Sequence, residues 1–448
     1  MLRFPARRFA SSAAAVVLAL AAMGGLARSQ APAGEGDTSS VLPPDGRARE
    51  AVFERFKPSI LTIEVYPLGG EARSTLGSGY VVGPGRIVTN YHVVGSYIQE
   101  PARFRLQVKS NAGPREASLV AFDLVNDLAL LEAAVDAPAL RLAAQPGGRG
   151  APILAFGNPE GLGMSLVEGV FNGFAEKGFV DRMLLSMPLH PGMSGGPILN
   201  ARHEVVGTNV ATSWRSNVLS FGVPVTAVHA LLAAPRIETS LEALRAETHR
   251  QLVDLETRAR ERAVAPILAG TGGLTSVGGA QTPRPPDAFE CWTYTATPEQ
   301  SGVGKTSYRC NLQFTPSIED VGEVASFEIL VEHLTSPQSS YGFYGGLSAH
   351  AAEHHGISAR PPDNGTISPP HCQNVRVKTA YLVWTVSTCS YAYVRHPDLG
   401  HFALVATSES RPREAIFVAL HGRGVGLEVF ARLSETILAE TRFEAPPS

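Results

Sequence analysis

Short apolar runs separated by Gly, Pro and Asn dominate the chain from residue 60 to residue 226. They include ILTIEV at 60–65, RIVTN at 86–90, LALLE at 128–132 and EVVGTNV at 204–210. Many short strands that end in turn signals are typical of an all-β barrel or sandwich. We therefore predict an all-β domain over residues 48–228. Its first element is a short helix that Pro58 stops.

The spacing of the apolar positions changes after this domain. Leu241, Leu244, Leu252 and Leu255 fall near helical spacing among many Glu and Arg residues, which predicts a helical segment at 229–265 that ends before Pro266. This pattern fits a helix packed on the preceding domain. A stalk or a contact between two copies of the chain would give the same pattern.

The last third of the chain reads as a linker followed by a second domain. Residues 266–288 are rich in Gly, Pro and Thr without periodicity, which predicts a linker. Strand-like runs lie at 326–334, 380–387, 401–408 and 415–422, and a helix is expected near 425–440. Alternating strands with one helix predict a small α+β domain at 289–443.

Length and composition agree with this division. The chain has 448 residues, enough for two or three domains, with 44% apolar and 18% charged residues. These values are typical of globular chains rather than disordered ones. The net charge is −3 and no long basic run is present, so we expect no nucleic-acid partner.

The first residues are typical of a targeting signal. Three arginines within the first eight residues precede a small, apolar run at 11–26, which is short for a bilayer span. We predict a signal peptide at 1–31 and a linker at 32–47, and therefore export to the bacterial periplasm or envelope, or secretion. An uncleaved membrane anchor is the alternative for the same residues.

Cysteine usage supports export. The four cysteines, Cys291, Cys310, Cys372 and Cys389, all lie in the predicted second domain. An even count in an exported chain favours two disulfides, with three possible pairings. The chain has no C-x₂-C pair, the spacing that would indicate a zinc site. His350, Glu353 and His354 follow a zinc-protease order, but no third ligand is identifiable, so we expect no metal.

One serine, Ser194, stands among turn-forming residues in HPGMSGGPIL at 190–199. A surface turn would have this composition, but so would a loop that presents a nucleophile. A serine hydroxyl needs a neutral imidazole as base, and the imidazole needs an anion to hold its tautomer. His92 follows the strand-like IVTN, and Asp127 directly precedes LALL. Asp123 is a rival for the anion.

The order His, Asp, Ser along the chain is one of three familiar orders for this constellation. Around it, GSGYVVGPGRIVTNYHVV, FDLVNDLALLE, AFGNPEGLG, PGMSGGPILN, EVVGTNV and FGVPV follow one another. In order and spacing they resemble the HtrA (Deg) branch of the chymotrypsin-like serine proteases. The resemblance covers about 50–228. Six collinear motifs are far more specific than any one of them.

The resemblance implies a fold and a set of roles. The fold would be two six-stranded β-barrels with the site between them. His92 would be the general base, Asp127 its orienting carboxylate and Ser194 the nucleophile. The backbone of Gly192, Met193 and Ser194 would form the oxyanion hole. Met193 departs from the Asn usual in this branch, which puts access and loop conformation in doubt but not the backbone donors.

The resemblance also outlines a specificity pocket. Pro188 and Leu189 would lie near its base, with Val210, Thr212, Phe221 and Val223 on its walls. No acidic residue stands at that base, so a preference for small or medium aliphatic side chains is expected. The PDZ domains usual in this branch are not recognisable in the second domain, whose role the sequence does not indicate.

Together these observations predict an exported serine endopeptidase that cleaves peptide bonds through an acyl-enzyme on Ser194, without a cofactor. The expected partners are protein or peptide substrates, without a membrane span after removal of the signal, and a homo-oligomer is compatible with the sequence. The alternative is a latent or inactive protease scaffold that acts as a binding protein or chaperone.

Overall fold

The structure of the chain is a computed structural model. It describes residues 46–178, 180–212, 219–297, 303–313, 315–318, 322–336, 343, 347, 350, 366–409 and 411–445. The predicted signal peptide, and the predicted linker at 32–47 up to residue 45, lie outside the described residues.

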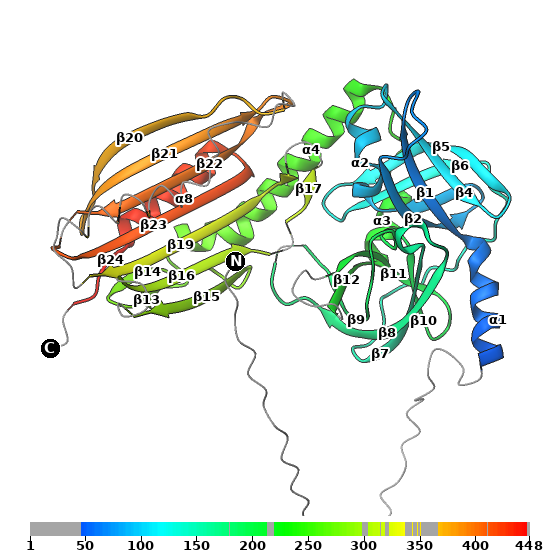
Figure 1. The fold of residues 1–448 in the computed structure, drawn as a ribbon, viewed down its shortest axis with the longest axis horizontal. Helices are drawn as coiled ribbons and strands as arrows, with labels where there is room; N and C mark the ends of the chain where they lie inside the picture. The colour runs from blue at the N-terminus through cyan, green and yellow to red at the C-terminus, as the bar shows by residue number, and fades with distance from the viewer. Residues whose placement is uncertain are drawn as a thin grey trace, which may run out of the picture. The chain divides into compact units, whose positions relative to one another are not determined.

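Six strands form the first barrel (Figure 1). They are β1 (Ile60–Pro67), β2 (Thr75–Gly83), β3 (Arg86–Thr89), β4 (Phe104–Ser110), β5 (Gly113–Asp123) and β6 (Leu128–Ala133), closed in the order β1-β2-β3-β6-β5-β4. The helix α1 (Gly46–Phe56) precedes the barrel, and α2 (Tyr91–Gln99) follows β3. Full closure leaves no strand edge exposed.

The second barrel has the same number of strands. They are β7 (Ala151–Gly157), β8 (Ser165–Phe174), β9 (Met183–Ser186), β10 (Pro197–Asn200), β11 (Val205–Thr212) and β12 (Leu219–Pro224), closed in the order β10-β11-β12-β9-β8-β7. One buried cluster contains Val88 and Leu130 of the first barrel and Phe156 and Leu199 of the second. The predicted double barrel is thereby confirmed, and the shared core joins its halves.

Helices follow the barrels, but not as one continuous segment. They are α3 (Val225–Ala233), α4 (Leu241–Ala259), a π-helical turn (Arg260–Val264) and α5 (Ala265–Leu268). The run breaks before α4, where Ser240 caps the helix by accepting from the N–H of Ala243 at 3.3 Å. The helical run also continues past the predicted end, because Pro266 lies in the first turn of α5, where its missing N–H is harmless.

The predicted linker at 266–288 contains two strands. β13 (Leu274–Val277) and β14 (Ala280–Pro283) form a hairpin through Gly278 and Gly279, and β24 (Arg442–Phe443) pairs with β14. A Gly-Gly pair suits a two-residue hairpin turn because positive φ is accessible to it, and Gly278 has a φ of 61°. The strands are too short for periodicity to reveal them.

A seven-stranded antiparallel sheet dominates the C-terminal domain. Its order is β15 (Phe289–Ala296), β16 (Gly304–Leu312), β19 (Ser326–Thr335), β23 (Glu414–Val425), β22 (His396–Ser408), β21 (Val383–Tyr393) and β20 (His371–Lys378). The helix α8 (Leu427–Glu440) buries Phe430, Leu433 and Ile437. A small hairpin of β17 (Ser317–Ile318) and β18 (Gly322–Glu323) stands between β16 and β19 in the chain.

Both disulfides lie at the edges of this sheet. Cys291 of the edge strand β15 is bonded to Cys310 of β16, and Cys372 of the edge strand β20 is bonded to Cys389 of β21. In each case the two cysteines are directly opposite each other in the strand register. Of the three pairings that the sequence allows, the structure therefore has the one that joins each edge strand to its neighbour.

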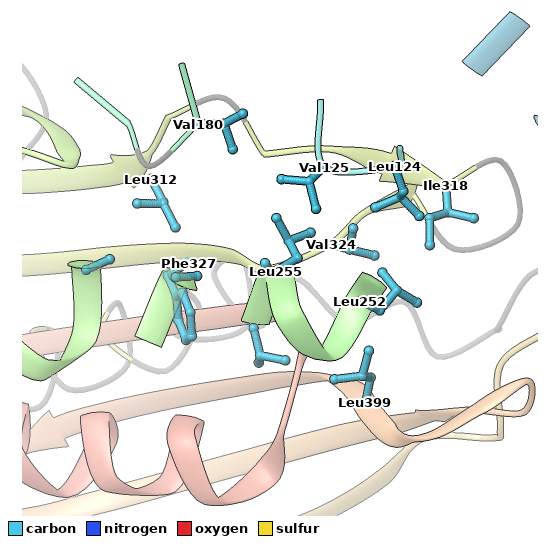
Figure 2. Packing of buried hydrophobic residues seen from close by; sticks show 14 of the residues in the cluster. Leu124, Val125, Val180, Leu252, Leu255, Leu312, Ile318, Val324, Phe327 and Leu399 are labelled. Atoms are coloured by element: carbon cyan, nitrogen blue, oxygen red, sulfur yellow. The ribbon is translucent and has the colours of Figure 1, made fainter. Parts of the chain in front are cut away.

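The helix α4 joins the two halves of the molecule through a shared hydrophobic cluster. Figure 2 shows Leu124 and Val125, from the loop between β5 and β6, in one cluster with Leu255 of α4 and with Ile318 and Val324 of the C-terminal domain. Across the described residues, no helix has both the length and the apolar character needed to cross a membrane.

Where α4 meets the C-terminal sheet, acid should destabilise the protein. The rings of His249 and His396 stack at 6.0 Å between centroids. Burial first, and then the nearby His249, Arg395 and Arg245, lower the pKa of His396 to about 4. The unfolded chain therefore binds more protons between pH 6.5 and 4, and stability that is present above 6.5 is lost as the pH falls.

We expect the free energy of unfolding to fall by about 3 kcal/mol over this range because of His396 alone. Thermal unfolding at pH 7 and pH 4.5 measures it, and His396→Gln should flatten the dependence. Equal pH dependence in the parent and in His396→Gln would contradict this expectation.

Candidate active site

The base candidate His92 lies at the start of α2, directly after β3. Asn90 precedes the helix with extended backbone angles (φ −84°, ψ 152°). The chain therefore turns sharply there, and the second residue of the helix remains accessible. The side chain of His92 is 43% exposed, although Tyr91 and Val93 beside it are buried.

Asp127 holds His92 with both of its carboxylate oxygens. Oδ2 lies 2.7 Å from Nδ1 of His92, and Oδ1 accepts from the backbone N–H of His92 at 2.9 Å. Asn90 Nδ2 donates to the carbonyl of Asp127 at 2.7 Å. Asp127 has a φ of 61°, a conformation that Asp tolerates better than most residues. The predicted pairing of His92 with Asp127 rather than Asp123 is what the structure contains.

This pairing changes the basicity of His92. Partial desolvation by the surrounding protein opposes protonation of the ring, but the charge and the hydrogen bond of Asp127 outweigh it and raise the pKa of His92 above its ordinary value of 6.5. A carboxylate on Nδ1 also leaves Nε2 as the nitrogen that can accept a proton.

A tight turn precedes Ser194. The N–H of Met193 donates to the carbonyl of His190 at 3.0 Å, and Gly192 has a φ of 91°. Pro at the second position and Gly with positive φ at the third are the signature of a type II turn. A Cβ at Gly192 would also collide with the carbonyl of Asn158. The sequence His-Pro-Gly-Met thus fixes the direction of the peptide that leads into the serine.

Two neighbouring groups hold this turn from outside. The N–H of Glu160 donates to the carbonyl of Pro191 at 2.9 Å. Because C=O and N–H point in opposite directions in a trans peptide, the N–H of Gly192 points away from Glu160. The buried residue Ser78 makes two hydrogen bonds to this part of the chain. Its Oγ donates to the carbonyl of Gly192 at 2.7 Å, and its backbone N–H donates to the carbonyl of Ser194 at 2.7 Å.

Two backbone donors remain at the turn. Among the hydrogen bonds of the described residues, the N–H groups of Gly192 and Ser194 have no acceptor, whereas the N–H of Met193 is used within the turn. Of the three residues predicted to form an oxyanion hole, Gly192 and Ser194 therefore offer donors, and Met193 contributes to the shape of the loop.

Ser194 itself is turned away from His92. Its Oγ donates to the carbonyl of Val210 on β11 at 2.7 Å. Within the described part of the chain, the side chain of His92 is hydrogen-bonded to Asp127 alone. The His–Asp half of the predicted triad is thus assembled, and the serine hydroxyl must rotate to reach the imidazole.

These groups surround a cavity of about 510 Å³. His92, Asp127 and Ser194 line it, together with three of the six predicted pocket residues, namely Leu189, Val210 and Phe221. Val223 is fully buried in the core shared by the barrels, and Pro188 is exposed and does not line the cavity. The side chain of Thr212 lies outside the description.

Other lining residues have no counterpart in the sequence predictions. Arg182 precedes β9, and Thr315, Pro316 and Ser317 come from the C-terminal domain. A buried arginine and a distant segment carry no local sequence signal, because only the tertiary fold brings them to the cavity.

Metal-ligating side chains do not gather in the described part of the chain. Of the zinc-protease-like trio, Glu353 and His354 lie outside the described residues. His350 instead makes an ion pair with the buried Glu332.

Comparison with known proteins agrees with the fold. Residues 77–207 match the family model of the trypsin-like peptidase domain. The double barrel is a trypsin-like peptidase domain. This peptidase domain contains His92, Asp127 and Ser194, and the match ends within β11.

The curated relatives are HtrA/Deg-like proteins. Protease Do-like 1, chloroplastic, from Arabidopsis thaliana is 30% identical over 43% of this chain and 48% of its own length. A probable periplasmic serine endoprotease DegP-like from Pseudomonas fulva is 33% identical over 44% of this chain and 43% of its own. The solved serine endoprotease from Yersinia pestis is 26% identical, with a TM-score of 0.36, over 41% of this chain and 64% of that chain.

The chain spans about half the length of the curated relatives that it matches. The similarity thus describes the peptidase domain, and the C-terminal seven-stranded sheet lies beyond the family match.

Proposed function

We propose that this protein is a serine endopeptidase that cleaves peptide bonds through an acyl-enzyme on Ser194. The observation that carries the proposal is the doubly hydrogen-bonded pair of His92 and Asp127, which lines one cavity with Ser194 on its type II turn. The similarity of the peptidase domain to DegP-like endoproteases supports it.

In the proposed reaction, rotation of Ser194 Oγ from Val210 toward His92 comes first. Oγ then attacks the scissile carbonyl carbon while Nε2 of His92 takes its proton. The same nitrogen protonates the leaving amine as the C–N bond breaks. Water, deprotonated by His92, then hydrolyses the ester and regenerates the hydroxyl. Asp127 stabilises the imidazolium that forms in each half.

The free N–H groups of Gly192 and Ser194 would stabilise the oxyanion of the tetrahedral intermediate. Each such preorganised donor contributes about 3 kcal/mol to lowering the barrier. The type II turn matters for this role because it fixes the Gly192 peptide before substrate arrives.

Ser78 is expected to position this oxyanion hole. Ser78→Ala removes the hydroxyl that donates to the Gly192 carbonyl and accepts from the N–H of Asn158 at 2.9 Å. We expect kcat to fall about tenfold with KM little changed, less than for loss of a direct donor. Steady-state kinetics measure this, with Ser186→Ala as the control, because Ser186 contacts Asn172 instead. A change confined to KM would contradict this role.

The activity should depend on pH through His92. The base must be neutral, and Asp127 raises its pKa above 6.5. We therefore expect kcat/KM to fall tenfold for each pH unit on the acid side of a midpoint that lies above 6.5. A midpoint near 4 or 5, measured with an uncharged substrate, would exclude His92 as the base.

The lining of the cavity supports an apolar preference at the cleaved residue. Leu189, Val210 and Phe221 line it beside Ser194. Val at the position before the scissile bond should therefore be favoured over Arg. Digestion of a peptide library, followed by mapping of the new termini, tests both the cleavage and this preference. Absence of new termini, or equal cleavage after Arg and Val, would oppose the respective claim.

A second candidate function is that of a latent enzyme or a binding scaffold. The hydrogen bond from Ser194 Oγ to Val210 favours it, because the hydroxyl is not poised on His92. An unfolded protein substrate that speeds the reaction of Ser194 would identify latency. We further propose an exported, periplasmic or envelope protein, which the two disulfides and the DegP-like relatives support. The proposed reaction itself uses no cofactor.

A further inference from the structure

The cavity at the active site has one wall that the peptidase domain does not supply. Thr315, Pro316 and Ser317 of the C-terminal domain line it together with His92 and Ser194. Ser317 begins the small hairpin of β17 and β18, and the next residue, Ile318, is buried. Any substrate that fills the cavity would therefore meet the C-terminal domain.

Hydrophobic packing anchors this wall. Ile318 and Val324, on either side of the hairpin turn, belong to the cluster that contains Leu124 and Val125 (Figure 2). The loop of Leu124 and Val125 leads directly to Asp127. Gln251 of α4 holds the same loop by accepting from the N–H of Leu124 at 2.6 Å.

Arg182 reaches the same loop from the second barrel. Its Nη2 donates to the carbonyl of Val125 at 3.3 Å, and its Nη1 donates to the carbonyl of Asp181 at 3.0 Å. Val180, close to Arg182 in sequence, packs in the cluster of Figure 2. Arg182 and the wall from the C-terminal domain thus line the same cavity.

Arg182 retains unused hydrogen-bonding capacity. It is only 6% exposed, and a guanidinium group has five N–H donors. Within the described residues its hydrogen bonds go to backbone carbonyls, and it forms no ion pair with a carboxylate. Buried arginines are normally paired with an anion, so a cavity-lining arginine that has no carboxylate partner among the described residues suggests a ligand that supplies one.

Nearby acids do not fill this role. Asp127 is engaged by His92, and Asp123 accepts from the N–H and the side-chain amide of Asn126 at 2.9 and 2.7 Å. Burial lowers the pKa of Arg182, and the charges of Asp127, Asp123 and Asp181 oppose this shift only in part. No hydrogen bond joins the guanidinium group to any of these three carboxylates within the described residues. The N–H donors of Arg182 that these two backbone carbonyls do not use are therefore without a carboxylate partner among the described residues.

We propose that Arg182 and the segment Thr315–Ser317 form a subsite of the cleft that selects a substrate side chain bearing a carboxylate. The guanidinium group would bind the carboxylate, and the hydroxyls of Thr315 and Ser317 would add donors from the opposite domain. The proposal rests on the proposed peptidase function, since it describes specificity at the same cavity. It also gives the C-terminal domain a role, that of completing the substrate site.

The test compares peptides that contain either Glu or its neutral isostere Gln at each of the four positions on either side of the scissile bond. For the parent chain we expect kcat/KM to favour Glu by about tenfold at one position. Arg182→Met should abolish this ratio, and Arg182→Lys should retain part of it. Removing both wall hydroxyls (Thr315→Ala with Ser317→Ala) should reduce it. The control Tyr294→Ala, at an exposed site on β15, should leave it unchanged.

The ratio separates recognition from a structural role. If Arg182 only supported the Asp127 loop, Arg182→Met would slow both peptides equally, and an unchanged ratio would overturn the proposal. A parent chain without preference for Glu at any position would also overturn it, even if Arg182→Met did not fold.

A binding experiment keeps the test independent of catalysis. Fluorescence anisotropy measures the affinity of the same peptides for the full-length Ser194→Ala chain. Tighter binding of one Glu peptide without any cleavage by the parent would support the subsite and oppose the peptidase. Cleavage by the parent without a preference for Glu would do the reverse.

Discussion

Ser194→Ala is expected to reduce kcat on a peptide substrate by about 10⁶-fold while leaving the protein folded. The methyl group cannot form the acyl-enzyme, and the remaining donors of Gly192 and Ser194 can only assist attack by water. The variant loses the hydrogen bond from Ser194 Oγ to the Val210 carbonyl, which is worth only about 1 kcal/mol, so the unfolding temperature should change little. Kinetics on the parent and the variant, with thermal unfolding of both, measure the two effects.

Ser186→Ala is the matched control for this substitution. Ser186 lies on β9 of the same barrel, and its hydroxyl accepts from Asn172 at 2.7 Å. We expect its kcat to stay within about threefold of the parent, as is common for surface substitutions. Retained activity in Ser194→Ala would mean that another group is the nucleophile.

Asp127→Asn should reduce kcat near pH 7 by about 10⁴-fold, the loss known for this substitution in Ser-His-Asp proteases. The amide is similar in size and can still accept from the backbone N–H of His92. The Nδ2 donor of the new amide, however, would face Nδ1 of His92. In the parent chain this nitrogen lies 2.7 Å from a carboxylate oxygen of Asp127. The imidazole would then carry its proton on Nε2 and could not take one from Ser194.

Asp123→Asn tests whether this effect is specific to Asp127. Asp123 lies in the same loop and is satisfied by Asn126, not by His92. We expect less than about a threefold change in kcat for this variant, since its contacts lie outside the reacting groups. Equal losses in the two variants would indicate that the loop as a whole, rather than the His92 tautomer, had been disturbed.

The parts of the site that the sequence predicts are those with strong local signals. His92 follows a strand at a helix start, and the His-Pro-Gly-Met turn is encoded by residues that allow few other conformations. The strands of both barrels likewise follow from short apolar runs between turn residues. The order of the motifs then leaves one collinear arrangement for the triad.

Contacts between distant segments could not be predicted in this way. The hydrogen bond from Ser78 Oγ to the Gly192 carbonyl joins residues that are 114 positions apart in sequence. Neither Arg182 nor the segment Thr315–Ser317 carries a sequence motif, and only the fold brings them to one cavity. The rotation of Ser194 toward Val210 is a choice of side-chain rotamer, for which the sequence holds no signal.

Labelling of the purified chain with a fluorophosphonate probe is the most direct measurement of whether Ser194 is an activated nucleophile. Mass spectrometry of the parent, beside Ser194→Ala, should locate the modification on Ser194 alone, with a rate that rises as His92 loses its proton. Addition of a denatured protein substrate should speed the labelling if the Val210 contact delays the hydroxyl. A folded parent that stays unlabelled with and without such a substrate would contradict the proposed peptidase.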